Sequence, residues 1–135
     1  TAAVTVYSVG TVKNIDGIRT YIAVDGGMSD NPRPMMYDSV YEVFDPMRVT
    51  ADRTAQARIV GKHCESGDIL VNDASVPDGV AIGDLLVMPV TGAYGYSMAS
   101  NYNKVLRPAV VFVQGGAARL VIRRETPDDL VRLDV

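Results

Sequence analysis

The first part of the chain shows the clearest alternation of apolar and polar positions. Residues 2–12 alternate loosely between two faces and are rich in β-branched side chains, which predicts a strand. Asp16 and Gly17 then form a dipeptide that favours the positive φ angles of a tight turn. Residues 18–24 return as a second run of strand character. The pattern therefore predicts that these two strands pair as an antiparallel hairpin.

Further short runs of strand character occur at residues 37–44, 56–62, 69–71, 84–90, 108–113 and 118–124. The last two runs are joined by Gly115 and Gly116, which again favour a hairpin turn. A helix signal stands near the end, where Thr126 can cap a helix and Pro127 fits its first position. We expect a mainly β fold, a mostly antiparallel β-barrel or sandwich with one or two short helices.

Composition limits the classes of protein to which the chain can belong. Its 135 residues, 47% hydrophobic and 21% charged, fit one globular domain spanning residues 1–135. The net charge is -3 and the basic side chains are dispersed, which argues against a nucleic-acid surface. No apolar stretch approaches the roughly 20 residues of a membrane span. One cysteine and one histidine exclude an internal disulfide and are too few for a metal site, so we expect a metal-free cytoplasmic protein.

Three polar loops hold the candidate chemistry. We call residues 25–37 the arginine loop, residues 61–68 the cysteine loop and residues 91–103 the tyrosine loop. In the arginine loop, Arg33 lies between two prolines, so its backbone is stiff and its guanidinium could hold a carboxylate at little entropic cost. Tyr37 could add a hydroxyl group to the same anion. The alternatives at these positions are a surface arginine and a half-buried packing tyrosine.

The cysteine loop contains the single thiol of the chain, Cys64, in the string Gly-Lys-His-Cys-Glu-Ser-Gly-Asp. A free cysteine is most often a small buried side chain, whereas polar neighbours favour reactive chemistry, and the string alone leaves both interpretations open. Glu65 could bind an ammonium group in a cleft and is otherwise a solvated carboxylate. Adjacent side chains on an extended segment point to opposite faces, so we expect His63 to be structural and not a base for Cys64.

The tyrosine loop interleaves aromatic and small residues. This composition suits packing against a flat ring or against a facing protein surface. Burial in the core is the alternative for Tyr96 and Tyr102. That alternative is weaker for Tyr94, which lies between two small residues.

The three loops together resemble a known family. The segments VDGGMSDNPRPMMY, GKHCESGDIL and TGAYGYSMASNYN, followed by RPAVV and RRET, are similar in sequence and order to the C-terminal β-domain of bacterial diaminopimelate decarboxylases. The likeness runs from about Val9 onward. It implies a pyridoxal-phosphate enzyme with an alanine-racemase-like barrel and a separate β-domain. Such enzymes convert meso-2,6-diaminopimelate to L-lysine and carbon dioxide.

The resemblance also implies roles for individual side chains. Cys64 matches the family's proton donor, which acts after carbon dioxide has left, and Glu65 matches its substrate-binding neighbour. Both are expected to reach the active site of the opposite subunit in a homodimer. Arg33 and Tyr37 match residues that bind the distal carboxylate of the substrate. Tyr94 matches the tyrosine that contacts both substrate and cofactor.

Part of the family pattern is missing from this sequence. The family's upstream barrel provides a lysine that binds the cofactor covalently and a glycine-rich phosphate loop, and we expect this barrel to be absent from the chain. None of the lysines of this chain stands in the sequence context of the family's cofactor-binding lysine; they are Lys13, Lys62 and Lys104. The 135 residues alone are therefore expected to neither bind pyridoxal phosphate covalently nor decarboxylate a substrate.

Two other functions remain open at this point. Ornithine and arginine decarboxylases also place a cysteine before an acidic residue, although Glu65 followed by Ser-Gly-Asp favours the diaminopimelate branch. A non-catalytic β-barrel module would use the tyrosine loop for subunit contact alone. Three further polar residues of the loops have no implied catalytic role and are expected to be hydrogen-bonded supports: Asp68, Asn101 and Asn103.

Overall fold

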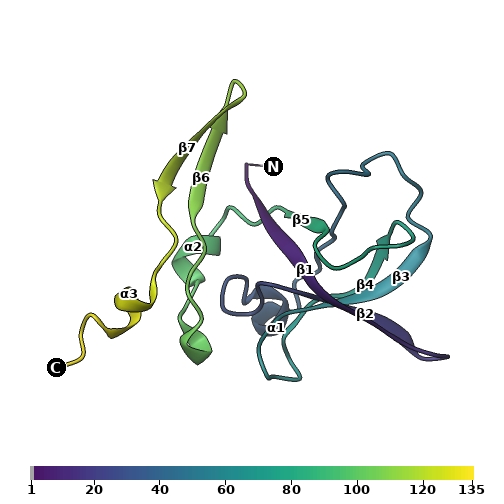
Figure 1. Cartoon of the computed structure of the whole chain (residues 1–135), viewed down its shortest axis with the longest axis horizontal. Helices are drawn as coiled ribbons and strands as arrows, with labels where there is room; N and C mark the ends of the chain where they lie inside the picture. Colours follow the sequence, from purple (N-terminus) through teal and green to yellow (C-terminus); the bar gives the residue numbers. More distant parts are fainter. Residues whose placement is uncertain (1) are drawn as a thin grey trace.

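The computed structural model describes residues 2–135 as a five-stranded sheet, a separate two-stranded hairpin and short helices (Figure 1). The elements are, in chain order, β1 (Val4–Ile15), β2 (Arg19–Val24), α1 (Arg33–Tyr37), β3 (Ala55–Val60), β4 (Ile69–Val76), β5 (Leu85–Pro89), α2 (Gly95–Met98), the 3-10 helix η1 (Tyr102–Lys104), β6 (Val110–Gln114), β7 (Ala117–Ile122) and α3 (Pro127–Val131). No helix in this described part is long and apolar enough to cross a membrane.

The five-stranded sheet has the strand order β4-β3-β2-β1-β5. Strands β1 and β2 form the expected antiparallel hairpin, with Lys13 opposite Tyr21. The pairs β1–β5 and β3–β4 are also antiparallel, whereas β2 and β3 run parallel. The prediction of a mainly β, mostly antiparallel fold is confirmed, with this one parallel pair inside the sheet.

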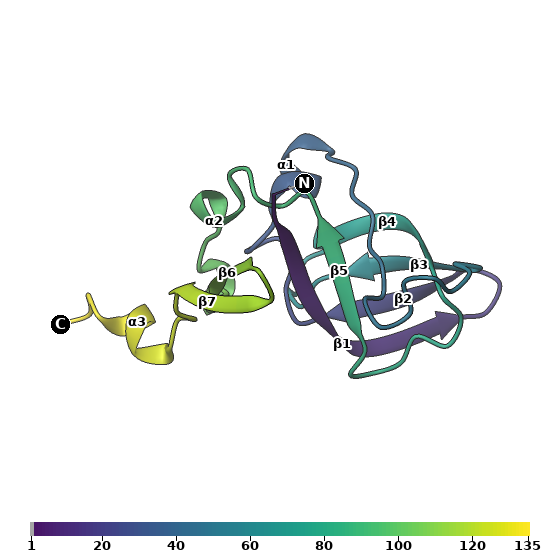
Figure 2. The same cartoon turned by 90° about the horizontal axis from the view of Figure 1, so that it is seen from above.

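Strand β1 pairs with two other strands, and this arrangement curls the sheet into a half-barrel. Its first part, from Val4 to Ser8, pairs with β5, and its second part pairs with β2. The register shifts between Val9 and Thr11. A bulge of this kind bends a strand and increases its local twist. Figure 2 shows β1 bending as it passes from one partner to the other.

The core lies on the concave side of the curled sheet and is made of apolar side chains that alternate along the strands. Burying each large aliphatic side chain contributes about 1.5–3 kcal/mol relative to leaving it exposed. The largest fully buried side chains are Ile22, Val43, Ile59, Leu70, Val76, Leu86 and Met88. Because they come from β2 to β5 and from the segment before β3, one core holds together the strands from which the three loops emerge.

The prediction of a strand at residues 37–44 is wrong. Tyr37 ends helix α1, and Phe44 makes only an isolated bridge, to Val87. The helix begins after Pro32, and the fixed φ angle of proline suits the first turn of a helix. Asp38, at a φ angle of 51°, ends it in the left-handed region. The two prolines that make Arg33 stiff therefore start a helical turn instead of preceding a strand.

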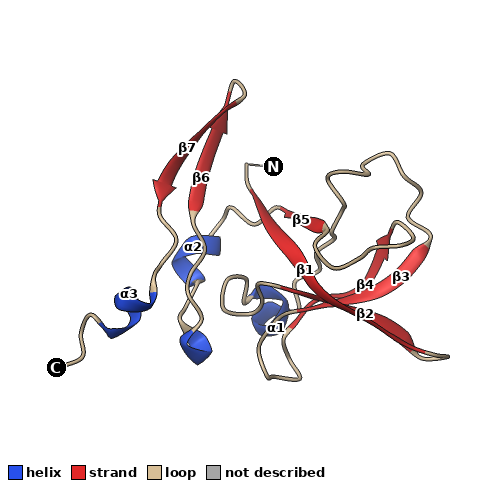
Figure 3. Cartoon of the chain, in the orientation of Figure 1, coloured by secondary structure: helices blue, strands red, loops and turns tan. Residues whose placement is uncertain are grey.

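More helical turns are present than the one or two that the sequence predicts. Helices α1 and α2 are single turns inside the polar loops, and neither has a side-chain hydrogen bond at its N-cap. Helix α3 matches its predicted start, since Thr126 and Asp129 form a capping box and Pro127 is its first residue. Figure 3 shows α1, α2 and α3 as short helices among long loops. Of the three, α3 has the capping signal that made it predictable from the sequence.

Strands β6 and β7 form the second predicted hairpin, which stands apart from the sheet (Figures 1 and 2). Gly115 and Gly116 adopt φ angles of 58° and 77°, as the turn requires. Val111, Phe112 and Leu120 are exposed on the hairpin.

Candidate functional site

The three polar loops lie together at one end of the sheet, and Ser29 joins them. Its backbone carbonyl accepts a hydrogen bond of 2.8 Å from the amide of Ser100 in the tyrosine loop. Its Oγ atom lies 2.8 Å from Nε2 of His63 in the cysteine loop. Ser29 and His63 are both buried. The expectation of a structural His63 is therefore confirmed.

Asp68 fixes the arginine and cysteine loops to each other. Its buried carboxylate accepts hydrogen bonds from the amides of Met28 at 2.7 Å and His63 at 2.8 Å. Any Cβ atom at Gly27 or Gly61 would overlap this carboxylate, so both positions require glycine. Asp68 is a loop support, as expected.

A half-buried carboxylate, Asp30, holds the arginine loop to β1. Its Oδ2 atom accepts a hydrogen bond of 2.6 Å from the hydroxyl group of Tyr7, and its Oδ1 atom accepts one of 2.7 Å from the amide of Gly27. Burial raises the pKa of the Asp30 carboxyl group. The pKa of Tyr7 is also raised, mainly by burial and secondly by the negative charge of Asp30. Tyr7 was not predicted to support the loop, because in the sequence it is one of several residues in a run of strand character.

Helix α1 brings Arg33 and Tyr37 together. The guanidinium carbon of Arg33 lies 6.0 Å from the centre of the Tyr37 ring. Within residues 2–135 the buried Nε atom of Arg33 has no hydrogen-bond partner. Tyr37 is 60% exposed, so its interpretation as a half-buried packing residue is wrong. The pair presents a cation and a hydroxyl group of the kind that hold a carboxylate.

Cys64 and Glu65 are exposed at the tip of the cysteine loop, while the preceding His63 is buried. The two neighbours thus point to opposite sides, as expected. The alternative of a buried Cys64 is wrong for this chain. The Glu65 carboxylate accepts a hydrogen bond of 2.5 Å from the hydroxyl group of Tyr102. This contact joins the cysteine and tyrosine loops at the surface.

Tyr94, Tyr96 and Tyr102 are 70%, 39% and 42% exposed, so core burial is wrong for the last two. Tyr94 caps α2 at a left-handed φ angle of 62°, and its ring is free of the core. The Tyr96 ring lies 5.5 Å from the guanidinium carbon of Arg107. The contact of Tyr102 with Glu65 was also not predicted from the sequence, because the two residues are 37 positions apart.

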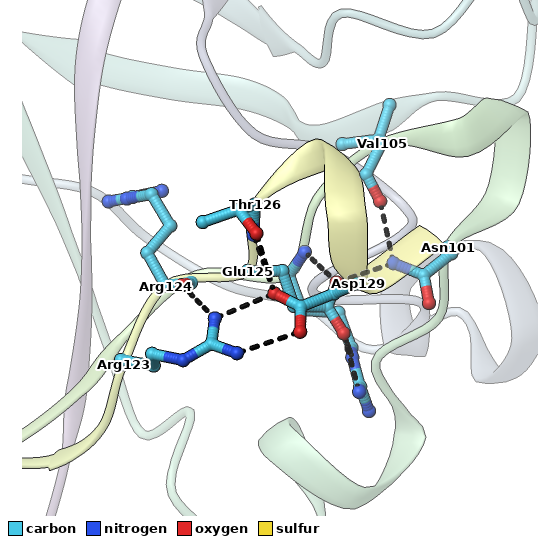
Figure 4. Close-up of polar contacts among 8 residues, drawn as sticks. Asn101, Val105, Arg123, Arg124, Glu125, Thr126 and Asp129 are labelled. Atoms are coloured by element: carbon cyan, nitrogen blue, oxygen red, sulfur yellow. Dashed lines mark hydrogen bonds and ion pairs between the residues drawn. The ribbon is translucent and has the colours of Figure 1, made fainter. Parts of the chain in front are cut away.

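A polar cluster fixes the far end of the tyrosine loop to the base of the β6–β7 hairpin (Figure 4). Glu125 accepts hydrogen bonds from Asn101 at 2.6 Å and from Nε of Arg107 at 2.7 Å. The Asn101 amide also donates to the carbonyl of Val105. The expected support role of Asn101 is confirmed. The hydrogen bonds from Arg107 and Asn101 lower the pKa of the Glu125 carboxyl group.

This lowered pKa predicts an acid-sensitive contribution to stability. The folded state binds the Glu125 proton less readily than the unfolded state, so the contribution is present above the usual pKa of 4.5 and is lost as the pH falls through the lower folded value. The melting temperatures of wild type and Glu125→Gln should therefore differ most near neutral pH and converge in acid. Glu42→Gln, at an exposed carboxylate, is the control. A difference that is constant with pH would contradict this prediction.

Comparison with known proteins places this arrangement in a family. Residues 1–92 match the model for the C-terminal sheet domain of pyridoxal-dependent decarboxylases. The chain belongs to this family. The match covers the arginine and cysteine loops and the first residues of the tyrosine loop.

Relatives extend the match to nearly the whole decarboxylase domain. The diaminopimelate decarboxylase of Corynebacterium efficiens is 52% identical over 138 residues, which cover 99% of this chain and 30% of that protein. The crystal structure of M. jannaschii diaminopimelate decarboxylase in complex with L-lysine has a TM-score of 0.88 at 31% identity, covering 98% of this chain and 30% of that chain. The chain thus spans about a third of the length of these relatives.

A more distant structure shares the fold alone. The crystal structure of lysine/ornithine decarboxylase from Vibrio vulnificus has a TM-score of 0.62 at 22% identity. The match covers 74% of this chain and 26% of that chain. The likeness is therefore greater, in both sequence and extent, to the structures of diaminopimelate decarboxylases.

The residues of this decarboxylase domain fit the edge of a pyridoxal-phosphate site and not a complete one. A cavity of about 320 Å³ beneath the cysteine loop has no lysine in its lining. Lys62 lines a recess of only about 50 Å³, too small for a ring and a phosphate group. Tyr94, with its exposed ring, is the candidate for a stacking or edge contact with the cofactor.

Proposed function

We propose that this chain is the C-terminal sheet domain of a diaminopimelate decarboxylase, which converts meso-2,6-diaminopimelate to L-lysine and carbon dioxide. The observation that carries the proposal is the 52% identity to an enzyme of that name, spread over 99% of the chain. We assign the binding of pyridoxal phosphate to the remaining two thirds of the full-length protein. That cofactor, when bound, withdraws electrons from the substrate carbon that loses carbon dioxide.

Cys64 is the proposed proton donor. Its Sγ–H bond breaks, the proton goes to the carbon that has lost carbon dioxide, and the thiolate is then protonated from water. A thiol that stays reduced is needed for this step, which agrees with a cytoplasmic location. Its exposure in the isolated chain suits a residue that is covered only when another subunit is present.

Substrate selection is assigned to charged groups on both sides of the dimer. Arg33 and Tyr37 lie close enough to hold one distal carboxylate between a guanidinium and a hydroxyl group. We assign to Glu65, at the exposed tip of the cysteine loop, the binding of the ammonium group of a substrate in the opposite subunit. A polar clamp that is buried when substrate binds disfavours analogues that lack the distal groups, because the clamp is then left unpaired.

A homodimer follows from this division of labour. Cys64 and Glu65 are exposed at the tip of the cysteine loop, and Arg33 belongs to a separate helix with its own partner, Tyr37. We therefore assign Arg33, Tyr37 and Tyr94 to the active site of their own subunit. Cys64 and Glu65 complete the site of the neighbouring subunit.

The substrate is tested with the full-length, cofactor-loaded protein. We expect release of L-lysine and carbon dioxide from meso-2,6-diaminopimelate, with little turnover of ornithine or arginine, because those two lack the distal carboxylate. Turnover of ornithine or arginine in its place would assign the chain to the related decarboxylases. Absence of turnover with all three would favour a non-catalytic module and contradict the proposal.

A further inference from the structure

We propose that Tyr102 is a positioning residue that orients the Glu65 carboxylate toward the ammonium group of the substrate. The inference rests on the proposed function, because it concerns the same substrate site. It adds a residue from the tyrosine loop to the machinery of the cysteine loop.

The contact itself is short and joins two loops. The Tyr102 hydroxyl group donates to Oε1 of Glu65 at 2.5 Å, across a separation of 37 residues. Both side chains are exposed, so this is a surface contact that burial does not impose. The direction is set by chemistry, since an ionised carboxylate only accepts and the phenol has a proton to donate. Consistent with this, the hydrogen bond to Glu65 raises the pKa of Tyr102.

Tyr102 is held from several sides, whereas Glu65 sits at a loop tip. The Tyr102 carbonyl accepts a hydrogen bond from Val105, and the preceding Ser100 is bonded to the arginine loop through Ser29. The Tyr102 ring lies 5.6 Å from the ring of the buried His63, centre to centre, at an angle of 49°. The hydroxyl group is thus set in place by the fold, and it restrains a flexible carboxylate.

The consequence is a carboxylate prepared for binding. The Tyr102 hydroxyl group bonds to Oε1, and among residues 2–135 Oε2 is open to an ammonium group. Restraining a rotamer-rich side chain before binding removes its ordering cost from the free energy of binding. Because the restraint acts on binding and not on the transfer of the proton, its loss should appear in KM and spare kcat.

The test uses Tyr102→Phe in the full-length holoenzyme, which keeps the ring beside His63 and removes only the hydroxyl group. We expect KM for diaminopimelate to rise about three- to tenfold, the effect of losing the pre-ordering of one side chain, with kcat changed less than about twofold. In a Glu65→Gln background the same substitution should change KM less than about twofold. Tyr96→Phe is the matched control, since Tyr96 is similarly exposed in the same loop and contacts Arg107 instead. An equal rise in KM in both backgrounds, or a fall in kcat alone, would overturn the inference.

A titration separates this inference from the proposed function. Glu65→Gln should lower the pKa of Tyr102 toward its usual value of 10.0, measured by NMR of ring-labelled tyrosine and assigned with Tyr102→Phe. If the pKa of Tyr102 falls in Glu65→Gln but the protein does not act on diaminopimelate, the contact is supported and the proposed substrate is rejected. If the pKa of Tyr102 does not change in Glu65→Gln and the wild-type protein decarboxylates diaminopimelate, the contact is rejected and the proposed function stands.

Discussion

Replacing Cys64 by alanine is expected to lower kcat for L-lysine formation by about 10²–10⁴-fold, the contribution typical of a positioned general acid. The thiol is the group that we assign to deliver the proton after carbon dioxide leaves. Its side chain is exposed in the chain, so its loss should leave the fold intact. The measurement is single-substrate kinetics with diaminopimelate, together with the melting temperature of the variant.

The neighbouring Ser66 offers a matched control in the same exposed loop. Ser66→Ala should keep kcat within about threefold of wild type, because no proton transfer is assigned to it. A Cys64→Ala enzyme with wild-type kcat would show that the thiol does not donate the proton. A fall in kcat accompanied by a lower melting temperature would show that Cys64 acts through the fold.

Asp68→Ala is expected to destabilise the domain by about 2–5 kcal/mol, because two backbone amides, those of Met28 and His63, lose their acceptor in a buried place. The small side chain also leaves a gap against Gly27 and Gly61, where no Cβ atom can fill it. Denaturant unfolding measures the free energy. Amide hydrogen exchange should show faster exchange at Met28 and His63.

Asp73 is the matched control for this substitution. It lies on β4, a few residues beyond Asp68, and its side chain is 75% exposed in an ion pair with Arg19. Asp73→Ala should cost less than about 1 kcal/mol, as surface ion pairs do. Similar losses for the two substitutions would contradict the role of Asp68 as the support of both loops.

Much of the fold could be predicted from local patterns. The two hairpins follow from alternating runs joined by glycine-containing turns, and α3 follows from its capping box at Thr126. Residues 37–44 misled because their apolar side chains, Val40, Tyr41, Val43 and Phe44, suit a strand, whereas only Phe44 pairs, in its isolated bridge to Val87. The parallel pairing of β2 with β3 depends on contacts between distant segments, which no local pattern encodes.

The candidate site divides in the same way. The three loops stand out in the sequence by their polar, turn-forming composition, and Arg33, Tyr37, Cys64, Glu65 and Tyr94 are carried by motifs. The residues that hold the loops together were less visible. The contacts of Tyr7 with Asp30 and of Tyr102 with Glu65 join positions 23 and 37 residues apart. Such pairs become evident only when the fold is known.

The most direct test of the account is complementation between two inactive variants of the full-length protein. Cys64→Ala and Arg33→Ala subunits, co-expressed with different tags, are purified as a heterodimer and assayed with diaminopimelate. If Cys64 serves the opposite subunit, one of the two sites retains both residues, and about half of the wild-type activity per dimer returns. If Cys64 and Arg33 instead serve the same subunit, every site of the heterodimer lacks one of them. Activity no higher than that of either variant alone would therefore contradict the account.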